Sequence, residues 1–243
     1  MARRTKQDAA VTRERLLDAA ERLFRRHGVG HTSLAEVADA AGVTRGAVYW
    51  HFKDKSDLFQ AMVARAEMPH ERNLQEMCAA ASDDPLGALR QATIRALTQF
   101  AKDRRARDVF EVVFLRCEYT AELAPVQRRQ YASRLDCYAQ IERAMRLAVR
   151  QGQLPAHVSP RLAARGLYAY VGGLIRDLLE APAEIDCARD APHLVDFFLD
   201  GLKNVPRYGH ARQPTIAGRR KPPARTSPAR NKPARRRAGA ASA

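Results

Sequence analysis

Side chains suited to reading a nucleic acid are concentrated in one short segment, between Thr44 and His51. Arg45 carries a planar fork of donors that fits the O6 and N7 acceptors of guanine, the commonest specific contact to a base. Thr44, directly before it, can contact a phosphate or a thymine methyl group. These residue types predict a surface that contacts DNA.

The other residues of this segment divide into small and large ones. Gly46 and Ala47 are small, which lets a helix backbone come close to the bases. Tyr49, Trp50 and His51 are large and can contact the sugar–phosphate backbone, and Tyr49 can also pack on a thymine methyl group. Two alternatives stay open, because Trp50 can serve mainly for packing and His51 can be a solvated helix end.

Residues around this segment suit phosphate groups. Lys55 and Ser33 stand at predicted helix starts, where unpaired backbone N–H groups favour an anion. Arg3, Arg4 and Lys6 can form a flexible basic arm that reaches a minor groove. The complete set of predicted DNA-binding residues is Ser33, Thr44, Arg45, Gly46, Ala47, Tyr49, Trp50, His51 and Lys55.

Two short helices joined by a tight turn must position these side chains. Ser33 followed by Glu36 is a capping box, which marks a helix start. Gly42 ends that helix because only glycine adopts the left-handed conformation at low cost. Thr44 can then cap a second helix, which continues toward Phe52. The pattern is that of a helix-turn-helix, whose second helix enters a DNA groove.

A helix before the motif and one after it complete the domain. The earlier helix ends at Gly28 and has one apolar face. The later helix has Asp54 as its cap, and Val48 and Phe52 of the motif are expected to face the shared core. The apolar face of the earlier helix consists of Leu16, Ala19, Ala20, Leu23 and Phe24.

At these residues the chain resembles a known family. The segment GVTRGAVYWHFKDKSDLF, from Gly42 to Phe59, is similar to the DNA-binding domain of TetR-type repressors. MARRTKQDA at the N-terminus and FLRCE, from Phe114 to Glu118, are similar to the AcrR-like branch, which represses multidrug efflux pumps. The resemblance implies an all-α protein with a three-helix helix-turn-helix domain and a larger C-terminal helical domain for ligand binding and dimerisation.

The chain is predicted to have four parts: a flexible basic arm over residues 1–10, the DNA-binding domain over 11–68, the C-terminal domain over 69–206 and a tail over 207–243. The apolar periodicity and the positions of proline and glycine predict helices over about 55–80, 85–102, 107–118, 125–151, 160–180 and 192–204. Pro69 predicts a kink or break in the first of these.

The last two predicted helices carry apolar stripes wider than one intramolecular core usually needs. A second copy of the chain can bury the excess in a two-fold interface, although ordinary core packing is the alternative. The resemblance favours a homodimer through these two helices, which would bind a palindromic operator in double-stranded DNA.

The resemblance also implies a pocket for a small hydrophobic or aromatic effector between the long C-terminal helices. Such pockets are mostly apolar, with a few polar anchors. The alternative for each candidate is an ordinary place in the core. The candidates are Leu89, Ala96, Phe110, Phe114, Cys137, Ile141, Tyr168, Val171 and Ile175.

Charge is distributed unevenly along the chain. Of the 42 Lys and Arg residues, 11 lie in the tail, which has no acidic residue. The first 206 residues carry 31 basic and 27 acidic residues, so most of the net charge of +15 belongs to the tail. The tail is too polar to fold alone, and it either binds phosphates non-specifically or merely aids solubility.

Several other classes of protein are not supported. The sequence has no Gly-rich phosphate loop, no GxSxG or HExxH motif and no cluster of His with carboxylates, which argues against an enzyme. The 4 cysteines form no CxxC pair, so neither a metal site nor a cofactor is expected. No apolar run reaches the length of a membrane span and no signal peptide is recognisable, which predicts a cytoplasmic location with no membrane partner.

The sequence therefore predicts a ligand-responsive DNA-binding repressor, of a multidrug efflux operon if the resemblance extends to its target. A TetR-type regulator of metabolic or stress genes is an alternative. A non-specific architectural protein that binds DNA through its basic tail is another.

Overall fold

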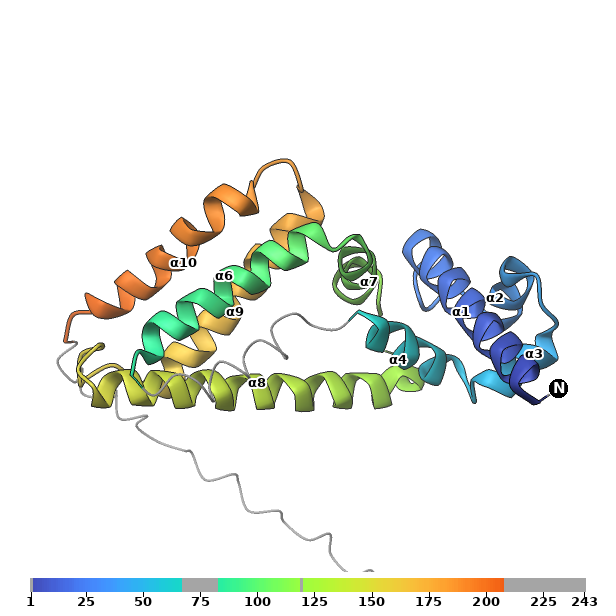
Figure 1. The fold of residues 1–243 in the computed structure, drawn as a ribbon, viewed down its shortest axis with the longest axis horizontal. Coiled ribbons are helices and arrows are strands. Elements are labelled where there is room, and N and C mark those ends of the chain that lie inside the picture. Colours follow the sequence, from blue (N-terminus) through green and yellow to red (C-terminus); the bar gives the residue numbers. More distant parts are fainter. Residues whose placement is uncertain (1, 67–82, 119, 208–243) are drawn as a thin grey trace, which may run out of the picture. The chain divides into compact units, whose positions relative to one another are not determined.

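Every regular element in the described part of the chain is helical. The structure is a computed structural model that describes residues 2–66, 83–118 and 120–207, apart from the side chains of residues 2–6. Within these ranges there are nine α-helices, one short 3₁₀ helix and no strand. The predicted all-α class is confirmed (Figure 1).

The N-terminal helices are α1 (Ala2–His27), α2 (Leu34–Ala41), α3 (Arg45–His51) and α4 (Lys55–Arg65). Ser33 and Glu36 form the predicted capping box at the start of α2. Gly42 ends α2 with a φ of 64°, and Thr44 caps α3 through its side chain. Local sequence therefore sets each boundary of the helix-turn-helix.

A single apolar core holds these helices together. Leu16 and Phe24 of α1, Val48 of α3 and Phe59 of α4 are fully buried in it. The rings of Phe24 and Phe59 meet edge to face, with centroids 5.9 Å apart. Figure 1 shows α1, α2 and α3 grouped together, and with α4 they form the N-terminal head.

Helix α1 begins earlier than the sequence predicted. Residues 2–10, which were expected to form a flexible arm, belong to α1. Arg, Lys, Gln and Ala are good helix formers, and no glycine or proline separates them from the apolar face that starts at Leu16. Nothing in this stretch therefore stops the helix from extending toward the N-terminus.

The C-terminal helices form a second packed group. They are α6 (Pro85–Lys102), α7 (Arg104–Leu115), α8 (Ala124–Arg150), α9 (Pro160–Glu180) and α10 (Cys187–Lys203), with the 3₁₀ helix η1 (Ala121–Leu123) before α8. Helix α8 packs along α9 and α6, and α6 also packs against α10 (Figure 1). Asp84, Asp103, Ser159 and Asp186 cap four of these helices through their side chains.

Helices α10 and α7 differ most from their predicted boundaries, and α7 also ends at Leu115 rather than near residue 118. Helix α10 was expected to begin at Pro192 but starts at Cys187, because Asp186 accepts hydrogen bonds from the N–H groups of Ala188 and Arg189. Pro192 therefore lies inside the helix rather than in its first turn. Helix α7 starts at Arg104 instead of Arg107, since Asp103 provides a cap that the predicted boundary did not take into account.

Helix α4 ends at Arg65, with Ala66 as its non-helical C-cap, so it does not continue unbroken toward residue 80 as predicted, and residues 67–82 lie outside the described part of the chain. The predicted kink at Pro69 lies outside the described residues, as does residue 208 onward, which is nearly all of the tail.

Candidate DNA interface and effector domain

Helix α3 has a buried face and an exposed face. Val48 is fully buried and Phe52, its C-cap, is 2% exposed, as predicted for residues facing the core. On the opposite face Tyr49 is 48% exposed and Trp50 is 73% exposed. A tryptophan this exposed contributes little to the core, so the packing alternative for Trp50 is not supported by the structure.

The exposed face of α3 is organised around Arg45 and Tyr49. The guanidinium carbon of Arg45 lies 5.9 Å from the centre of the Tyr49 ring, which is the range of a cation–π contact. Thr44, Arg45 and Gly46 are exposed, and Ala47 is partly exposed. The predicted reading residues thus lie on one accessible surface.

His51 is less accessible than its neighbours. Its ring stacks edge to face on Trp50, with centroids 4.6 Å apart. Partial burial, and secondarily the nearby charge of Arg13, lower the pKa of His51 below its ordinary value. In the free protein this shift favours the neutral form of the His51 ring.

Ser33 is exposed, but its hydroxyl is already engaged. Its Oγ accepts from the N–H of Glu36 at 3.2 Å and donates to the Glu36 carboxylate at 2.8 Å. Hydrogen bonds from the backbone and side chain of Ser33 lower the pKa of Glu36, which keeps that carboxylate charged. A phosphate at Ser33 would have to approach this negative charge.

Lys55 also has partners within the protein. Its Nζ lies 3.2 Å from a carboxylate oxygen of Glu122 in η1 and 3.4 Å from the carbonyl oxygen of Thr32. The Lys55 side chain is only 14% exposed. Sequence reasoning missed Glu122, because nothing in the sequence places the connection between two later helices beside the start of α4.

The predicted effector-pocket residues come from four helices that pack on one another: α6, α7, α8 and α9. Tyr168 and Val171 are partly buried against the core, whereas Phe114 is 41% exposed. Aromatic contacts join Phe100, Phe110 and Phe114 in series, at 5.4 and 5.7 Å between centroids. The fully packed candidates are Leu89, Ala96, Phe110, Cys137, Ile141 and Ile175.

Two pockets among the described residues lie elsewhere. One, of about 360 Å³, lies where α6 and α7 meet the start of α10, beside Lys102, Arg107 and Cys187. The other, of about 550 Å³, lies between α6 and α10 beside Arg90 and Asp196. None of the nine predicted pocket residues lines either one, and no sequence pattern indicates these pockets because both depend on how α10 packs.

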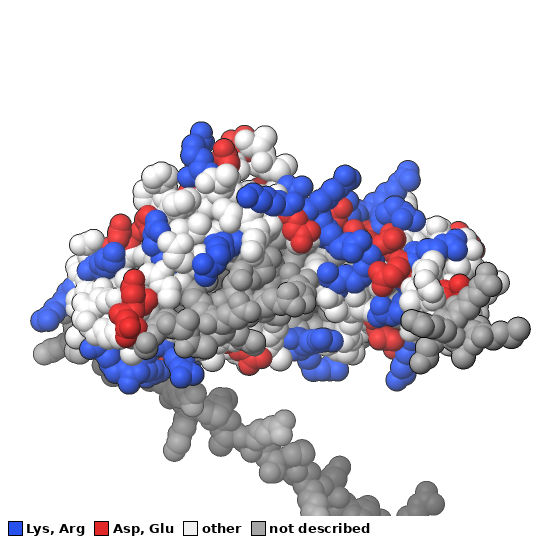
Figure 2. Space-filling model, viewed as in Figure 1, with Lys and Arg blue, Asp and Glu red and all other residues white. Residues whose placement is uncertain are grey.

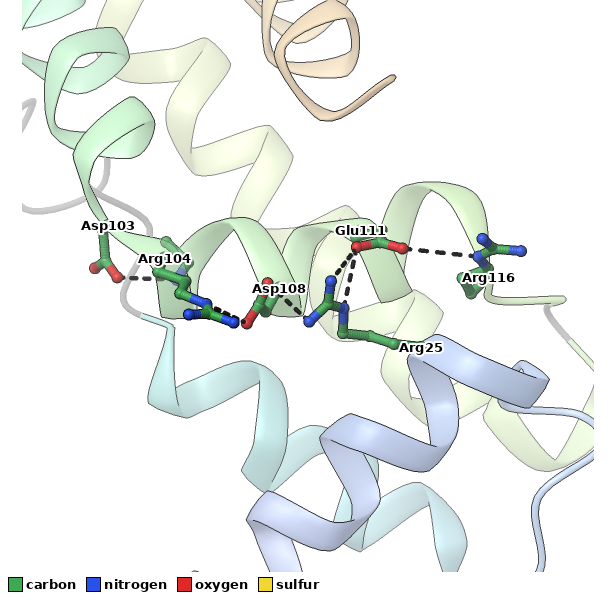
Figure 3. Close-up of polar contacts among 7 residues, drawn as sticks. Arg25, Asp103, Arg104, Asp108, Glu111 and Arg116 are labelled. Atoms are coloured by element: carbon green, nitrogen blue, oxygen red, sulfur yellow. Dashed lines mark hydrogen bonds and ion pairs between the residues drawn. The ribbon is translucent and has the colours of Figure 1, made fainter. Parts of the chain in front are cut away.

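Ion pairs connect the head to the C-terminal helices. Arg25 of α1 lies 2.9 Å from Asp108 and donates to Glu111 at 2.8 and 3.0 Å, both on α7. Arg104 and Arg116 pair more loosely with the same two carboxylates (Figure 3). A backbone hydrogen bond from Val29 to the carbonyl of Arg116, at 3.2 Å, reinforces this joint.

On the face shown in Figure 2, charge does not form one basic patch. Figure 2 shows Lys and Arg intermingled with Asp and Glu on the displayed face. Among the described residues, no group of three or more His, Cys, Asp or Glu is arranged to hold a metal ion. No described helix combines the length and the apolar character of a membrane span.

A capped helix-turn-helix with an exposed reading face, joined to a separate helical domain, defines a DNA-binding transcriptional regulator. Family comparison supports the same class. Residues 16–62 match the model of bacterial regulatory proteins of the tetR family, and residues 84–204 match the C-terminal region of MAATS-type transcriptional repressors.

Individual relatives agree over nearly their whole length. The chain is 38% identical over 206 residues to the HTH-type transcriptional regulator TtgR of Pseudomonas putida, an alignment that covers 85% of this chain and 98% of TtgR. The structure of NalD, described as the secondary repressor of the MexAB-OprM multidrug efflux pump in Pseudomonas aeruginosa, is similar with a TM-score of 0.74 and 36% identity, covering 81% of this chain and 99% of NalD.

A third relative was solved with a ligand. The complex of SmeT with triclosan has a TM-score of 0.68 and 36% identity, and it covers 80% of this chain and 93% of SmeT. SmeT is described as the repressor of the Stenotrophomonas maltophilia multidrug efflux pump SmeDEF. The chain belongs to the TetR family, whose members are DNA-binding transcriptional regulators rather than enzymes.

Proposed function

We propose that this protein is a dimeric, ligand-responsive repressor of a multidrug efflux operon, acting in the cytoplasm. The observation that carries the DNA-binding part is the two-faced α3 helix, with Val48 fully buried and Trp50 73% exposed. Such a helix is anchored by one side and free to enter a major groove with the other. Efflux genes are the proposed target because NalD and SmeT are described as repressors of efflux pumps.

Base reading is assigned to the N-terminal part of α3. Arg45 would donate to guanine, and Thr44 would contact a phosphate or a thymine methyl group. Tyr49 and Trp50 would contact the sugar–phosphate backbone beside them. The exposure of all four side chains in the free protein supports this assignment.

Dimerisation is proposed to use α9 and α10. Large apolar side chains are exposed on both helices: Leu162 is 69% exposed and Phe197 is 71% exposed. A Cβ added at Gly173 of α9 or Gly201 of α10 would meet nothing within 4 Å, so a second backbone has room to approach there. The variant Phe197→Asp should convert the dimer to a monomer in light scattering, whereas Tyr131→Asp, an exposed aromatic on α8, should not.

The effector is proposed to be a small hydrophobic or aromatic compound held among α6, α7, α8 and α9. Support comes from the apolar residues that these helices place together and from the triclosan complex of SmeT. Ligand would bind better to a conformer whose two recognition helices are wrongly spaced for successive major grooves. Reciprocity then requires that DNA weakens ligand binding by the same factor.

Two routes can carry this coupling. Helix α4, the last helix of the head, packs against α7 and α8. The Arg25 joint connects α1 to α7, which contributes Phe110 and Phe114 to the proposed pocket (Figure 3). A shift of α7 on ligand binding would therefore reach the head through both α4 and α1.

Mobility shift with the DNA upstream of its own gene tests the proposal, using triclosan and then a panel of apolar drugs as probes. The expected result is a defined complex that dissociates when an active compound is added. A complex that no compound dissociates would support the alternative of a TetR-type regulator of metabolic or stress genes, with another class of effector. Binding to any duplex without preference would instead favour the architectural alternative.

A further inference from the structure

The ion pair between Lys55 and Glu122 joins the DNA-binding head to the connection between α7 and α8. Lys55 is the first residue of α4, and Glu122 lies in η1. Their charged atoms are 3.2 Å apart. The pair links the proposed DNA-contacting surface to the effector domain. Forming or breaking the ion pair can therefore affect both of them.

Lys55 lies at the edge of the DNA-contacting surface. Its Nζ donates to the carbonyl oxygen of Thr32, the residue directly before Ser33. Asp54 caps α4 by accepting from the N–H of Asp57, which fixes the helix start and with it the stem of Lys55. The amine is therefore held close to where a phosphate would meet the starts of α2 and α4.

The two partners differ in freedom. The Lys55 side chain is 14% exposed, whereas the Glu122 side chain is 48% exposed. Glu122 can thus leave the amine without opening the core, while Lys55 has little room to move. Leu123, the residue directly after Glu122, is fully buried, so the position of Glu122 follows that of the effector domain.

Other contacts also place the α7–α8 connection against the head. Arg116, at the end of α7, accepts a hydrogen bond from the N–H of Val29. A Cβ at Gly30 would lie 3.9 Å from the Glu118 carboxylate, and η1 packs against α4. Arg116 therefore lies beside the α1–α2 loop, and η1 lies beside α4.

We propose that Glu122 is a positioning residue that competes with a DNA phosphate for Lys55, so that the effector domain tunes DNA affinity through the α7–α8 connection. The proposal rests on the proposed function only in taking Lys55 as a phosphate contact. A carboxylate 3.2 Å from the amine both occupies it and repels an incoming phosphate. Movement of the connection would change the availability of the amine without altering any residue that reads bases.

The test uses Glu122→Gln, which keeps the shape and hydrogen-bonding oxygen of the side chain but removes its charge. Affinity is measured by fluorescence anisotropy for the upstream duplex and for a scrambled duplex, over a salt series. The variant should bind both duplexes about two- to fivefold tighter at low salt, the size expected for an exposed ion pair. The gain should shrink as salt rises, because exposed charges are screened.

Two further variants separate competition from a structural effect. Lys55→Gln should weaken binding to both duplexes and lower the salt slope by about one. Combined with Lys55→Gln, the Glu122→Gln substitution should give no gain. Glu180→Gln is the matched control, since Glu180 is 46% exposed and pairs with Arg176 on α9.

A Glu122→Gln variant that binds no tighter than the wild type would overturn the proposal. A gain that persists in the double variant would also overturn it, because the charge would then act elsewhere. Failure of the wild type to prefer the upstream duplex would contradict the proposed function instead. The gain on both duplexes would still support competition for Lys55 in that case.

Discussion

The DNA-binding head and the effector domain differ in how their functional residues are placed. In the head, the reading residues lie on one seven-residue helix bounded by Thr44 and Phe52. In the effector domain, the proposed pocket draws on four helices, α6, α7, α8 and α9, which tertiary packing brings together. A site built on one capped segment can be recognised from local sequence, whereas a site assembled from four helices depends on tertiary structure.

The same contrast appears between single aromatic residues. Trp50 on α3 is 73% exposed, so a place in the core does not account for it. Phe110 on α7 is 3% exposed, so an ordinary core position accounts for it equally well. Burial therefore argues against a core role for Trp50 but leaves the role of Phe110 open between core and pocket.

The largest expected effect is a loss of stability in the head. Phe59→Ala should lower the free energy of unfolding by about 3–5 kcal/mol, because it leaves a cavity beside Phe24. Trp50→Ala, on the exposed face, should change it by about 0.5 kcal/mol or less. Urea denaturation followed by circular dichroism measures both. Equal destabilisation by the two variants would show that Trp50 belongs to the core.

The second prediction compares two phenylalanines of α7 in the effector domain. Phe110→Ala should destabilise the protein by about 3–5 kcal/mol, since its ring is buried against Phe100. Phe114→Ala should cost about 1 kcal/mol or less while weakening binding of an active apolar compound. Calorimetric titration and thermal melting distinguish these outcomes. Unchanged ligand affinity in Phe114→Ala would remove that residue from the pocket.

The third prediction concerns base reading. Arg45→Ala should cost about 1–3 kcal/mol of operator affinity, roughly 5- to 150-fold, and should relax the preference at one base position. Arg150→Ala, a basic residue at the end of α8, serves as the control. Competition with single-base operator variants measures the effect. A loss of equal size on every sequence would make Arg45 a phosphate contact instead.

The smallest effect tests a charge pair within the effector domain. Arg90 donates two hydrogen bonds to Asp196, at 2.5 and 2.7 Å, and these lower the pKa of Asp196. A lowered carboxyl pKa stabilises the fold above the ordinary value of about 4, and this contribution is lost as pH falls through the folded-state pKa. Both side chains are about one-third exposed, so the contribution should stay below about 1 kcal/mol.

Melting temperatures of the wild type and Asp196→Asn, compared at pH 7 and pH 3, measure this contribution. The variant should melt slightly lower at pH 7, and the difference should be smaller at pH 3. Asp177→Asn on α9 is the control. A difference of equal size at the two pH values would assign the effect to packing rather than to charge.

Local sequence was enough to predict much of the fold. Ser33, Gly42, Thr44 and Asp54 each carry their capping role within a few residues, and all four caps are observed. The predicted helix start at Pro192 relied on the preference of proline for the first turn, and the predicted arm over residues 2–10 relied on its basic residues; both differ from the structure. The cap at Asp186 and the uninterrupted helix formers near the N-terminus outweighed those preferences.

The contacts between head and effector domain could not be predicted from the sequence. Arg25 and Glu111 are 86 residues apart, and Lys55 pairs with a glutamate on a different domain. No periodicity or cap relates residues at such separations. Only the packing of α1 on α7 and of η1 on α4 brings them together.

One measurement tests whether the head recognises an operator specifically. Fluorescence anisotropy would compare the upstream duplex with a scrambled duplex over a salt series, for the full chain and for residues 1–206. We predict tight binding to one palindrome, retained without the tail. Equal affinity for both duplexes that is lost with the tail would contradict the account.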